Sequence, residues 1–215
     1  MIISNPVEII LRLRSNYDLS KCSDEFLHFK NPYEILIATI LSAQTTDRCV
    51  NMVTRELFER YPDIESLANA DMGDVEKIVH STGFYHTKAR NIIATSRMVM
   101  TEYDGRVPDC MEDLICLPGV GRKTANIVLG HAFSKTVGIA VDTHVRRVSM
   151  RLGLTDQNEP DRIEADLTRI FPHEYWGEIN QLFILHGRKV CTARKPACDM
   201  CDLADLCRYA ISIQN

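Results

Sequence analysis

Four cysteines near the C-terminal end of the sequence form the group of residues with the clearest chemistry. Their spacing is C-x6-C-x2-C-x5-C, and they are Cys191, Cys198, Cys201 and Cys207. Thiolates are soft ligands, so four of them in one short segment indicate an iron–sulfur cluster or a tetrahedral zinc site. The spacing differs from ferredoxin runs and from the two C-x2-C pairs of common zinc ribbons. Two disulfides are the alternative, which the reducing compartment indicated by the rest of the chain disfavours.

A glycine-containing turn, LPGVG at residues 117–121, separates two apolar segments that are predicted to be helical. Gly119 and Gly121 allow backbone conformations that other residues avoid, and they let the main chain approach a ligand closely. The first N–H groups of the following helix have no partner within the helix, so they can bind a phosphate without reading a base. The alternative is an ordinary connection between two helices, but GVGRKTA between apolar half-helices is more specific than G-x-G alone.

The distribution of charge adds to this expectation. The chain has a formal net charge of −4, which by itself argues mildly against nucleic-acid binding. Residues 116–155, however, contain six Lys or Arg side chains and one Asp. A local basic face on an acidic body can bind phosphates, although a solvated helix face would have the same composition.

The composition predicts a folded protein of a reducing compartment. Hydrophobic residues make up 45% of the 215 residues, which is enough for a substantial core. The N-terminal stretch has interrupting charges and no small-residue cleavage site, so it is not a signal peptide, and no apolar run approaches the length of a membrane span. We therefore expect a soluble, cytoplasmic protein without a membrane partner. The other four cysteines are predicted to be free, buried thiols: Cys22, Cys49, Cys110 and Cys116.

Most of the chain has the apolar periodicity of helices. Asn5 and Asn31 each precede a proline and a nearby glutamate, a pattern typical of a helix start, and Asp71, Asp109 and Asp142 are predicted caps. Helices are expected to begin near Pro6 and Pro32 and to cover about 46–60, 71–83, 88–103, 109–116, 122–133, 142–152, 161–170 and 174–189. No hairpin signal, long alternating strand or fixed-period repeat is present, so the predicted fold class is all-α. A short extended link at 137–141 gives the one plausible division between domains.

The sequence resembles the endonuclease III family of DNA glycosylases. The segment LPGVGRKTA resembles the family's helix–hairpin–helix, VDTH at 141–144 its Val-Asp-Thr-His motif, and LSAQTTD at 41–47 its N-terminal motif. The cysteine spacing is similar to its [4Fe–4S] loop, and the motifs follow the family's order. The resemblance implies two helical domains flanking a DNA-binding cleft. One domain would be a six-helix domain at 25–135 with the hairpin at about 112–133, and the other an iron–sulfur domain from 1–24 and 136–215.

The resemblance implies catalytic roles for Lys123 and Asp142. The family's lysine attacks C1′ of the damaged nucleotide and forms a Schiff base, after which elimination cuts the strand. Only a neutral amine can attack, and the positive end of the helix dipole favours the neutral form in a first helical turn. Asp142 would stabilise positive charge on the sugar and assist proton transfer, while also capping its helix. A solvent-facing or phosphate-binding lysine is the alternative.

Extruding a nucleotide leaves a gap in the duplex, and the resemblance places two residues that fill it, Gln44 and Phe84. Well-known members of the family have leucine where this chain has Phe84, although phenylalanine is also a suitable apolar wedge. The alternatives are an exposed loop residue for Gln44 and core packing for Phe84. His144 is expected to contact phosphate or to pack against Asp142.

Further DNA contacts are expected from the hairpin and from the cysteine segment. The hairpin contributes Gly119, Val120, Gly121 and Arg122. The six residues between Cys191 and Cys198 would form a small loop that presents Arg194 and Lys195 to phosphates, which gives the cluster a structural role. Arg146 and Arg147 are interpreted as solvated helix charges.

The resemblance therefore implies a bifunctional enzyme that removes oxidised pyrimidines such as thymine glycol and cuts the strand 3′ to the lesion. A monofunctional glycosylase for adenine or thymine mismatches is the alternative, but such relatives typically lack a lysine at position 123. A non-catalytic DNA-binding module and an electron-transfer protein are disfavoured, by the Lys123–Asp142 pairing and by the large helical body respectively. We expect a monomer that binds double-stranded DNA with a damaged base or an abasic site, associated with the nucleoid.

Overall fold

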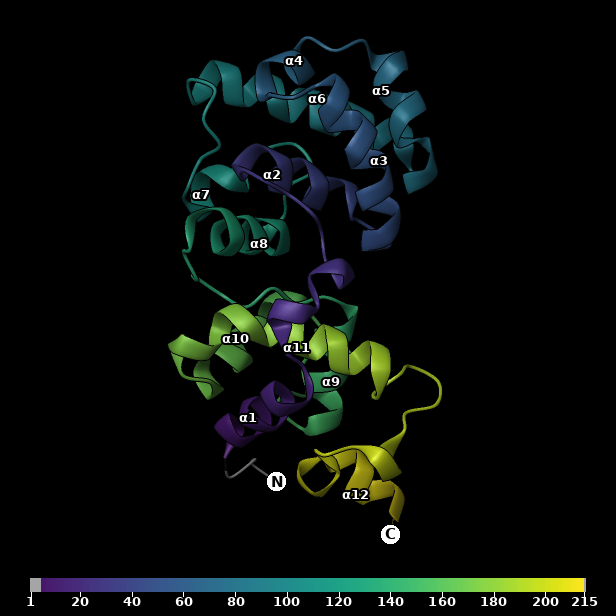
Figure 1. Cartoon of the computed structure of the whole chain (residues 1–215). Helices are drawn as coiled ribbons and strands as arrows, with labels where there is room; N and C mark the ends of the chain where they lie inside the picture. Colours follow the sequence, from purple (N-terminus) through teal and green to yellow (C-terminus); the bar gives the residue numbers. More distant parts are fainter. Residues whose placement is uncertain (1–4, 215) are drawn as a thin grey trace. The chain divides into compact units, whose positions relative to one another are not determined.

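The structure, a computed structural model, describes residues 5–214, and the regular secondary structure of these residues is helical (Figure 1). These residues contain no β-strand, so the predicted all-α fold class is confirmed. No helix among them is long and apolar enough to cross a membrane. The chain divides into two compact units, Ser23–Lys135 and Met1–Cys22 with Thr136–Asn215.

The unit Ser23–Lys135 is built around α2 (Pro32–Leu41), an apolar helix of which nine of the ten residues are buried. A helix that is apolar on all sides belongs in a core, and α2 packs against α8 (Arg122–Phe133), α6 (Tyr85–Glu102) and α3 (Asp47–Arg60). The shorter helices α4 (Ile64–Ala68) and α5 (Met72–Val79) lie against α6, and α7 (Met111–Leu114) lies against α8. One continuous hydrophobic core joins these helices.

In the other unit, α9 (Thr143–Leu152) packs against α11 (Trp176–Lys189), whose central residues are buried. The N-terminal helix α1 (Pro6–Asn16) packs on α11. The C-terminal helix α12 (Arg208–Gln214) packs on α9, so α1 and α12 each cover one member of the α9–α11 pair. The unit also contains α10 (Pro160–Ile170), and short 3₁₀ turns at Cys198–Met200 and Ala204–Leu206 lie in the cysteine segment.

Several predicted helix caps are confirmed, and two are wrong. Asn31 accepts a hydrogen bond from the Glu34 N–H (2.9 Å), and Asp71 accepts one from the Asp74 N–H (3.0 Å). Asn5 stands at the start of α1 but makes no capping bond through its side chain. Asp109 does not cap α7, which begins at Met111; instead its carboxylate binds Lys135 Nζ (2.5 Å).

Other differences from the sequence expectations have local causes. The helix expected from residue 88 begins at Tyr85, because Phe84 takes a left-handed conformation and serves as its N-cap residue. The helix expected to end near Gly83 ends at Val79 and continues as a 3₁₀ turn. The short helix α4 and the terminal helix α12 were not expected. The four scattered cysteines are free, but none is buried: three are partly exposed, and Cys116 is exposed.

Candidate functional site

The glycine turn is anchored to the body of its unit by α6. Gly119 has a φ of +79°, and a Cβ at this position would lie 2.8 Å from Asn91 Nδ2, so both the backbone conformation and the packing require glycine. Thr95 Oγ1 donates a hydrogen bond to the Pro118 carbonyl (2.7 Å). The side chain of Val120 is buried in the core, so this predicted contact residue can offer only its backbone to a ligand.

The start of α8 has the form of an anion site. In the part of the chain that the structure describes, no side chain caps this helix, because its N-cap residue is Gly121. The first N–H groups therefore depend on partners from outside the helix, and the dipole there favours a negative charge. Arg122 and Lys123 follow as the first two helical residues, and both are exposed. This is the arrangement with which helix N-termini bind phosphate groups.

Asp142 stands at the start of α9, in the unit that contains the cysteine segment. Its Oδ1 atom accepts hydrogen bonds from the backbone N–H groups of His144 and Val145, both at 2.8 Å. The predicted cap is thus confirmed, and it fixes the orientation of the carboxylate. The carboxylate is partly exposed, so it remains accessible for chemistry.

The histidine and arginines that follow Asp142 have specific partners. His144 Nδ1 lies 3.1 Å from an Arg147 guanidinium nitrogen. Arg147 also donates to the carbonyls of Cys191 (3.0 Å) and Gly187 (2.9 Å), so it connects α9 to the start of the cysteine segment. The interpretation of Arg147 as a solvated charge is therefore wrong. Arg146 is exposed and donates to Asn158 Oδ1 (2.9 Å).

Gln44 and Phe84 occupy the tips of two loops in the unit Ser23–Lys135. Both have left-handed backbone conformations, with φ of 54° and 49°, which residues other than glycine seldom adopt. Gln44 is exposed, and the Phe84 side chain is 71% exposed. Core packing, the alternative considered for Phe84, does not occur. An exposed aromatic tip in an unusual backbone conformation is a feature that often accompanies a functional site.

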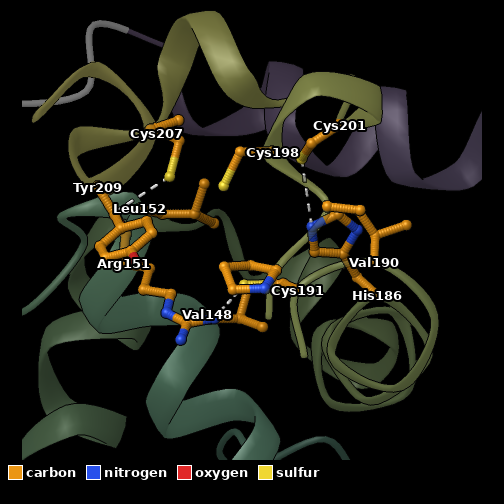
Figure 2. A pocket seen from close by; sticks show the side chains of 13 residues that line it. Val148, Arg151, Leu152, His186, Val190, Cys191, Cys198, Cys201, Cys207 and Tyr209 are labelled. Atoms are coloured by element: carbon orange, nitrogen blue, oxygen red, sulfur yellow. Dashed lines mark hydrogen bonds between the residues drawn. The ribbon is translucent and has the colours of Figure 1, made fainter. Parts of the chain in front are cut away.

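The four cysteines of the C-terminal segment line one pocket, and Figure 2 shows their sulfur atoms around its interior. None is in a disulfide. The wall between them is apolar, with Val148, Leu152 and Ala210 among the residues that line the pocket. Arg151 donates a hydrogen bond to Cys191 Sγ (3.3 Å), and His186 Nε2 lies 3.6 Å from Cys201 Sγ. Sequence reasoning missed both neighbours, since Arg151 is 40 residues from Cys191 and His186 is 15 residues from Cys201 in the chain.

The donor set fits an iron–sulfur cluster. Four thiols surround a space with an apolar wall, and thiolates are the ligands that iron–sulfur clusters require. In the described residues 5–214, no group of three or more His, Cys, Asp or Glu side chains is arranged so that it could hold a single metal ion. Burial raises the pKa of the Cys201 and Cys207 thiols, which favours their protonated form. Because cluster ligands are thiolates, these thiols must lose their protons when a cluster binds.

The loop between the first two cysteines is closed by its own hydrogen bonds. The Ala197 N–H donates to the Val190 carbonyl (3.0 Å), and Thr192 Oγ1 donates to the Lys195 carbonyl (2.6 Å). The Arg151 guanidinium group also donates hydrogen bonds to two loop carbonyls, those of Thr192 (2.7 Å) and Ala193 (2.9 Å). Its tip presents Arg194 and Lys195, which are both exposed.

Comparisons with known proteins agree with this geometry. Residues 37–173 match the family model of the HhH-GPD superfamily of base-excision DNA-repair proteins, and residues 191–207 match that of the iron–sulfur binding domain of endonuclease III. Endonuclease III of Synechocystis is 51% identical over 94% of this chain and 91% of its own length. The Escherichia coli K12 protein is 39% identical over 94% of both. A solved structure of a trapped endonuclease III–DNA covalent intermediate has a TM-score of 0.87 and 40% identity, covering 95% of this chain and 94% of its own.

The glycine hairpin on a helical body and the match over residues 37–173 define a DNA-repair protein of the helix–hairpin–helix superfamily. With the cysteine segment and the relatives described above, the chain belongs to the endonuclease III family. It is therefore a DNA glycosylase of base excision repair with associated AP (apurinic/apyrimidinic) lyase activity, it binds DNA, and its cofactor is a [4Fe–4S] cluster.

Proposed function

We propose that this enzyme removes oxidised pyrimidines such as thymine glycol from double-stranded DNA and then cuts the strand 3′ to the lesion. The observation that carries the proposal is an exposed lysine, Lys123, in the first turn of an uncapped helix directly after the glycine hairpin. The solved structure of a trapped endonuclease III–DNA covalent intermediate supports a covalent route in this family.

In the proposed reaction, the neutral amine of Lys123 attacks C1′ of the damaged nucleotide, and the base leaves as the new C–N bond forms. Opening of the sugar ring gives an imine to Lys123, and loss of the C2′ proton expels the 3′ phosphate in a β-elimination. Hydrolysis of the imine returns the free lysine. The lyase step thus needs no nucleophile other than the amine.

Asp142 is proposed as the second catalytic residue. Its carboxylate would stabilise the positive charge that develops on the sugar as the base leaves, and would assist proton transfer involving the lysine. The two backbone hydrogen bonds to Oδ1 support this role because they hold the carboxylate in one orientation without neutralising it.

The enzyme must extrude the damaged nucleotide from the duplex before C1′ can be attacked. Gln44 and Phe84 are proposed to fill the gap that remains, which their exposure and their position at loop tips support. We propose that phosphates are bound by the hairpin backbone at Gly119, Val120 and Gly121 and by Arg122. Further contacts are assigned to His144, Arg194 and Lys195. Such contacts make DNA binding sensitive to salt.

Cys191, Cys198, Cys201 and Cys207 are the proposed ligands of the cluster. We assign the cluster a structural role, which the position of the basic loop between its first two ligands supports. We further propose that the two compact units are the two predicted domains, that the enzyme acts as a monomer, and that it is a cytoplasmic protein associated with the nucleoid through DNA binding.

A mismatch glycosylase is the second candidate, because a solved thymine-DNA glycosylase has 28% identity and a TM-score of 0.78 over 86% of this chain. In the deciding experiment, purified enzyme is incubated with duplexes of otherwise identical sequence that carry thymine glycol, an abasic site, an adenine mismatch or a thymine mismatch. We expect base release and strand cleavage with thymine glycol and cleavage at the abasic site. Release of a mismatched base without strand cleavage would favour the second candidate.

A further inference from the structure

A buried lysine at the start of α6 is not used by the mechanism described above. The side chain of Lys88, the fourth residue of that helix, is only 5% exposed. Lysine is rarely buried unless its amine is paired, because removing the charged group from water is costly. A lysine in this position therefore needs partners, and its partners indicate its role.

Lys88 Nζ donates two hydrogen bonds, each of 2.6 Å, to groups on different loops. One acceptor is Thr45 Oγ1, in the loop between α2 and α3, and the other is the Thr82 carbonyl, in the turn before α6. Thr45 Oγ1 itself donates to the same Thr82 carbonyl. The amine, the hydroxyl and the carbonyl thus form a closed set of three polar groups that joins the two loops.

These are the loops that present Gln44 and Phe84. Gln44 immediately precedes Thr45, and Phe84 follows Thr82 by two residues. Both tips have the left-handed conformation that is unfavourable for residues with a side chain, and such conformations persist only where the surroundings hold them. The hydrogen bonds around Lys88 thus connect Thr45, which is next to Gln44, with Thr82, which is two residues before Phe84.

We propose that Lys88 is a positioning residue that locks the Gln44 and Phe84 loops in one relative orientation, so that both tips enter the duplex together during extrusion. The inference rests on the proposed function, in which these two residues fill the gap in the DNA. A buried amine that is directed at two protein oxygens is not placed to bind phosphate or to attack a sugar. Substitution of Lys88 should therefore slow the reaction only on substrates with a stacked duplex, which the Gln44 and Phe84 tips must enter.

The test compares Lys88→Met, which keeps an unbranched side chain one atom shorter and removes the donor, with Lys77→Met as the control. Lys77 is an exposed lysine of α5 in the same unit, ion-paired with Asp74. Single-turnover rates are measured on a thymine glycol duplex and on a single strand with an abasic site. A single strand has no base stack for the tips to enter, so only the lysine chemistry is measured there.

For Lys88→Met we expect base release from the duplex to slow by about tenfold, as for loss of a hydrogen bond from a charged donor, with the single-strand lyase rate within about twofold of wild type. The fluorescence of a 2-aminopurine next to the lesion, which reports unstacking, should fall in the same variant. Lys77→Met should leave both rates within about twofold. Thr45→Val should resemble Lys88→Met, and the double variant should be no slower than the worse single one, because both changes break the same set.

Equal slowing on both substrates would overturn the proposal, because it would indicate a general loss of folded enzyme. Unchanged rates would also overturn it. So would a decrease of about one unit in the slope of log affinity against log salt concentration, because that would make Lys88 a phosphate contact. Failure of the proposed function is distinguishable, since the wild-type enzyme itself would then not release thymine glycol.

Discussion

At the residue scale, Asp142 combines a structural and a chemical task in one side chain. Its Oδ1 atom accepts the two N–H groups that begin α9, and the reaction proposed here needs its negative charge. Asparagine is as good a cap as aspartate but carries no charge. A single substitution can therefore separate the two tasks.

We predict that Asp142→Asn folds normally and binds a lesion-containing duplex with nearly wild-type affinity, while base release slows by about 10²–10⁴-fold, the range of general acid–base and charge effects. Single-turnover excision and duplex binding, measured side by side, check this. Unchanged excision would remove Asp142 from the catalytic site.

Some residues of the site were predictable from the sequence, and others were not. The cysteines and Lys123 belong to short local motifs, and the structure brings the four cysteines around one pocket. Arg147 and Lys88 belong to no short motif, because Arg147 binds carbonyls at Gly187 and Cys191 and Lys88 binds Thr45, all at least 40 residues away in the chain. A hint was present for Lys88, since it falls on the same helical stripe as the buried residues Ile92 and Val99.

At the element scale, the hairpin depends on α6 as much as on its own two helices. The Pro118 carbonyl is bound by Thr95, and Gly119 packs against Asn91, so the turn cannot shift without disturbing α6. Gly121 differs, because its φ is negative and a Cβ there would meet nothing within 4 Å.

Gly119→Ala should accordingly lower the free energy of unfolding by about 1–2 kcal/mol, the cost of a side chain in a left-handed conformation, and should weaken duplex binding. Gly121→Ala should leave stability nearly unchanged. Chemical denaturation of both variants checks the prediction, and equal stability losses would contradict the account of the turn.

The short helix α4 gives a prediction for pH. The hydrogen bond from the Ser66 backbone N–H holds the pKa of Asp63 below its ordinary value of 3.8. The carboxylate therefore stabilises the folded state above that value, and this contribution disappears as the pH falls through the lower folded-state pKa. Asp63→Asn keeps the cap but does not titrate, so its stability should fall less between about pH 7 and about pH 3 than that of wild type. Identical pH profiles in denaturation would contradict the assignment.

Most helices were predictable because apolar periodicity and caps such as Asn31 and Asp71 agree with one another. Their boundaries failed where tertiary contacts decide the local conformation. Asp109 is a residue type that often caps helices, but its carboxylate binds Lys135 instead. The early start of α6 depends on Phe84, whose left-handed conformation no propensity predicts.

At the scale of the whole molecule, three arginines connect the cysteine segment to the rest of its unit. Arg151 and Arg147 bind its first part, and Arg12 of α1 binds the Asp205 carboxylate (2.6 Å) and the Asp202 carbonyl (2.7 Å). These contacts are with loops and 3₁₀ turns, which have little core of their own. The cluster is therefore expected to provide much of the order of this segment.

Cys198→Ser should lose the visible absorbance of the cluster and show faster amide hydrogen exchange in residues 190–214 and in α1. Exchange within Ser23–Lys135 should not change, because that unit has its own core. Cys116→Ser, which removes an exposed free thiol, serves as the control. Exchange that accelerates throughout both units would contradict a local role for the cluster.

The central claim is that Lys123 forms the covalent bond to DNA, and borohydride trapping on a thymine glycol duplex tests it most directly. Reduction of the imine should give a stable protein–DNA adduct with wild-type enzyme and none with Lys123→Gln, while both proteins still bind the duplex. An adduct that persists in Lys123→Gln, or no adduct with wild-type enzyme that still releases the base, would contradict the claim.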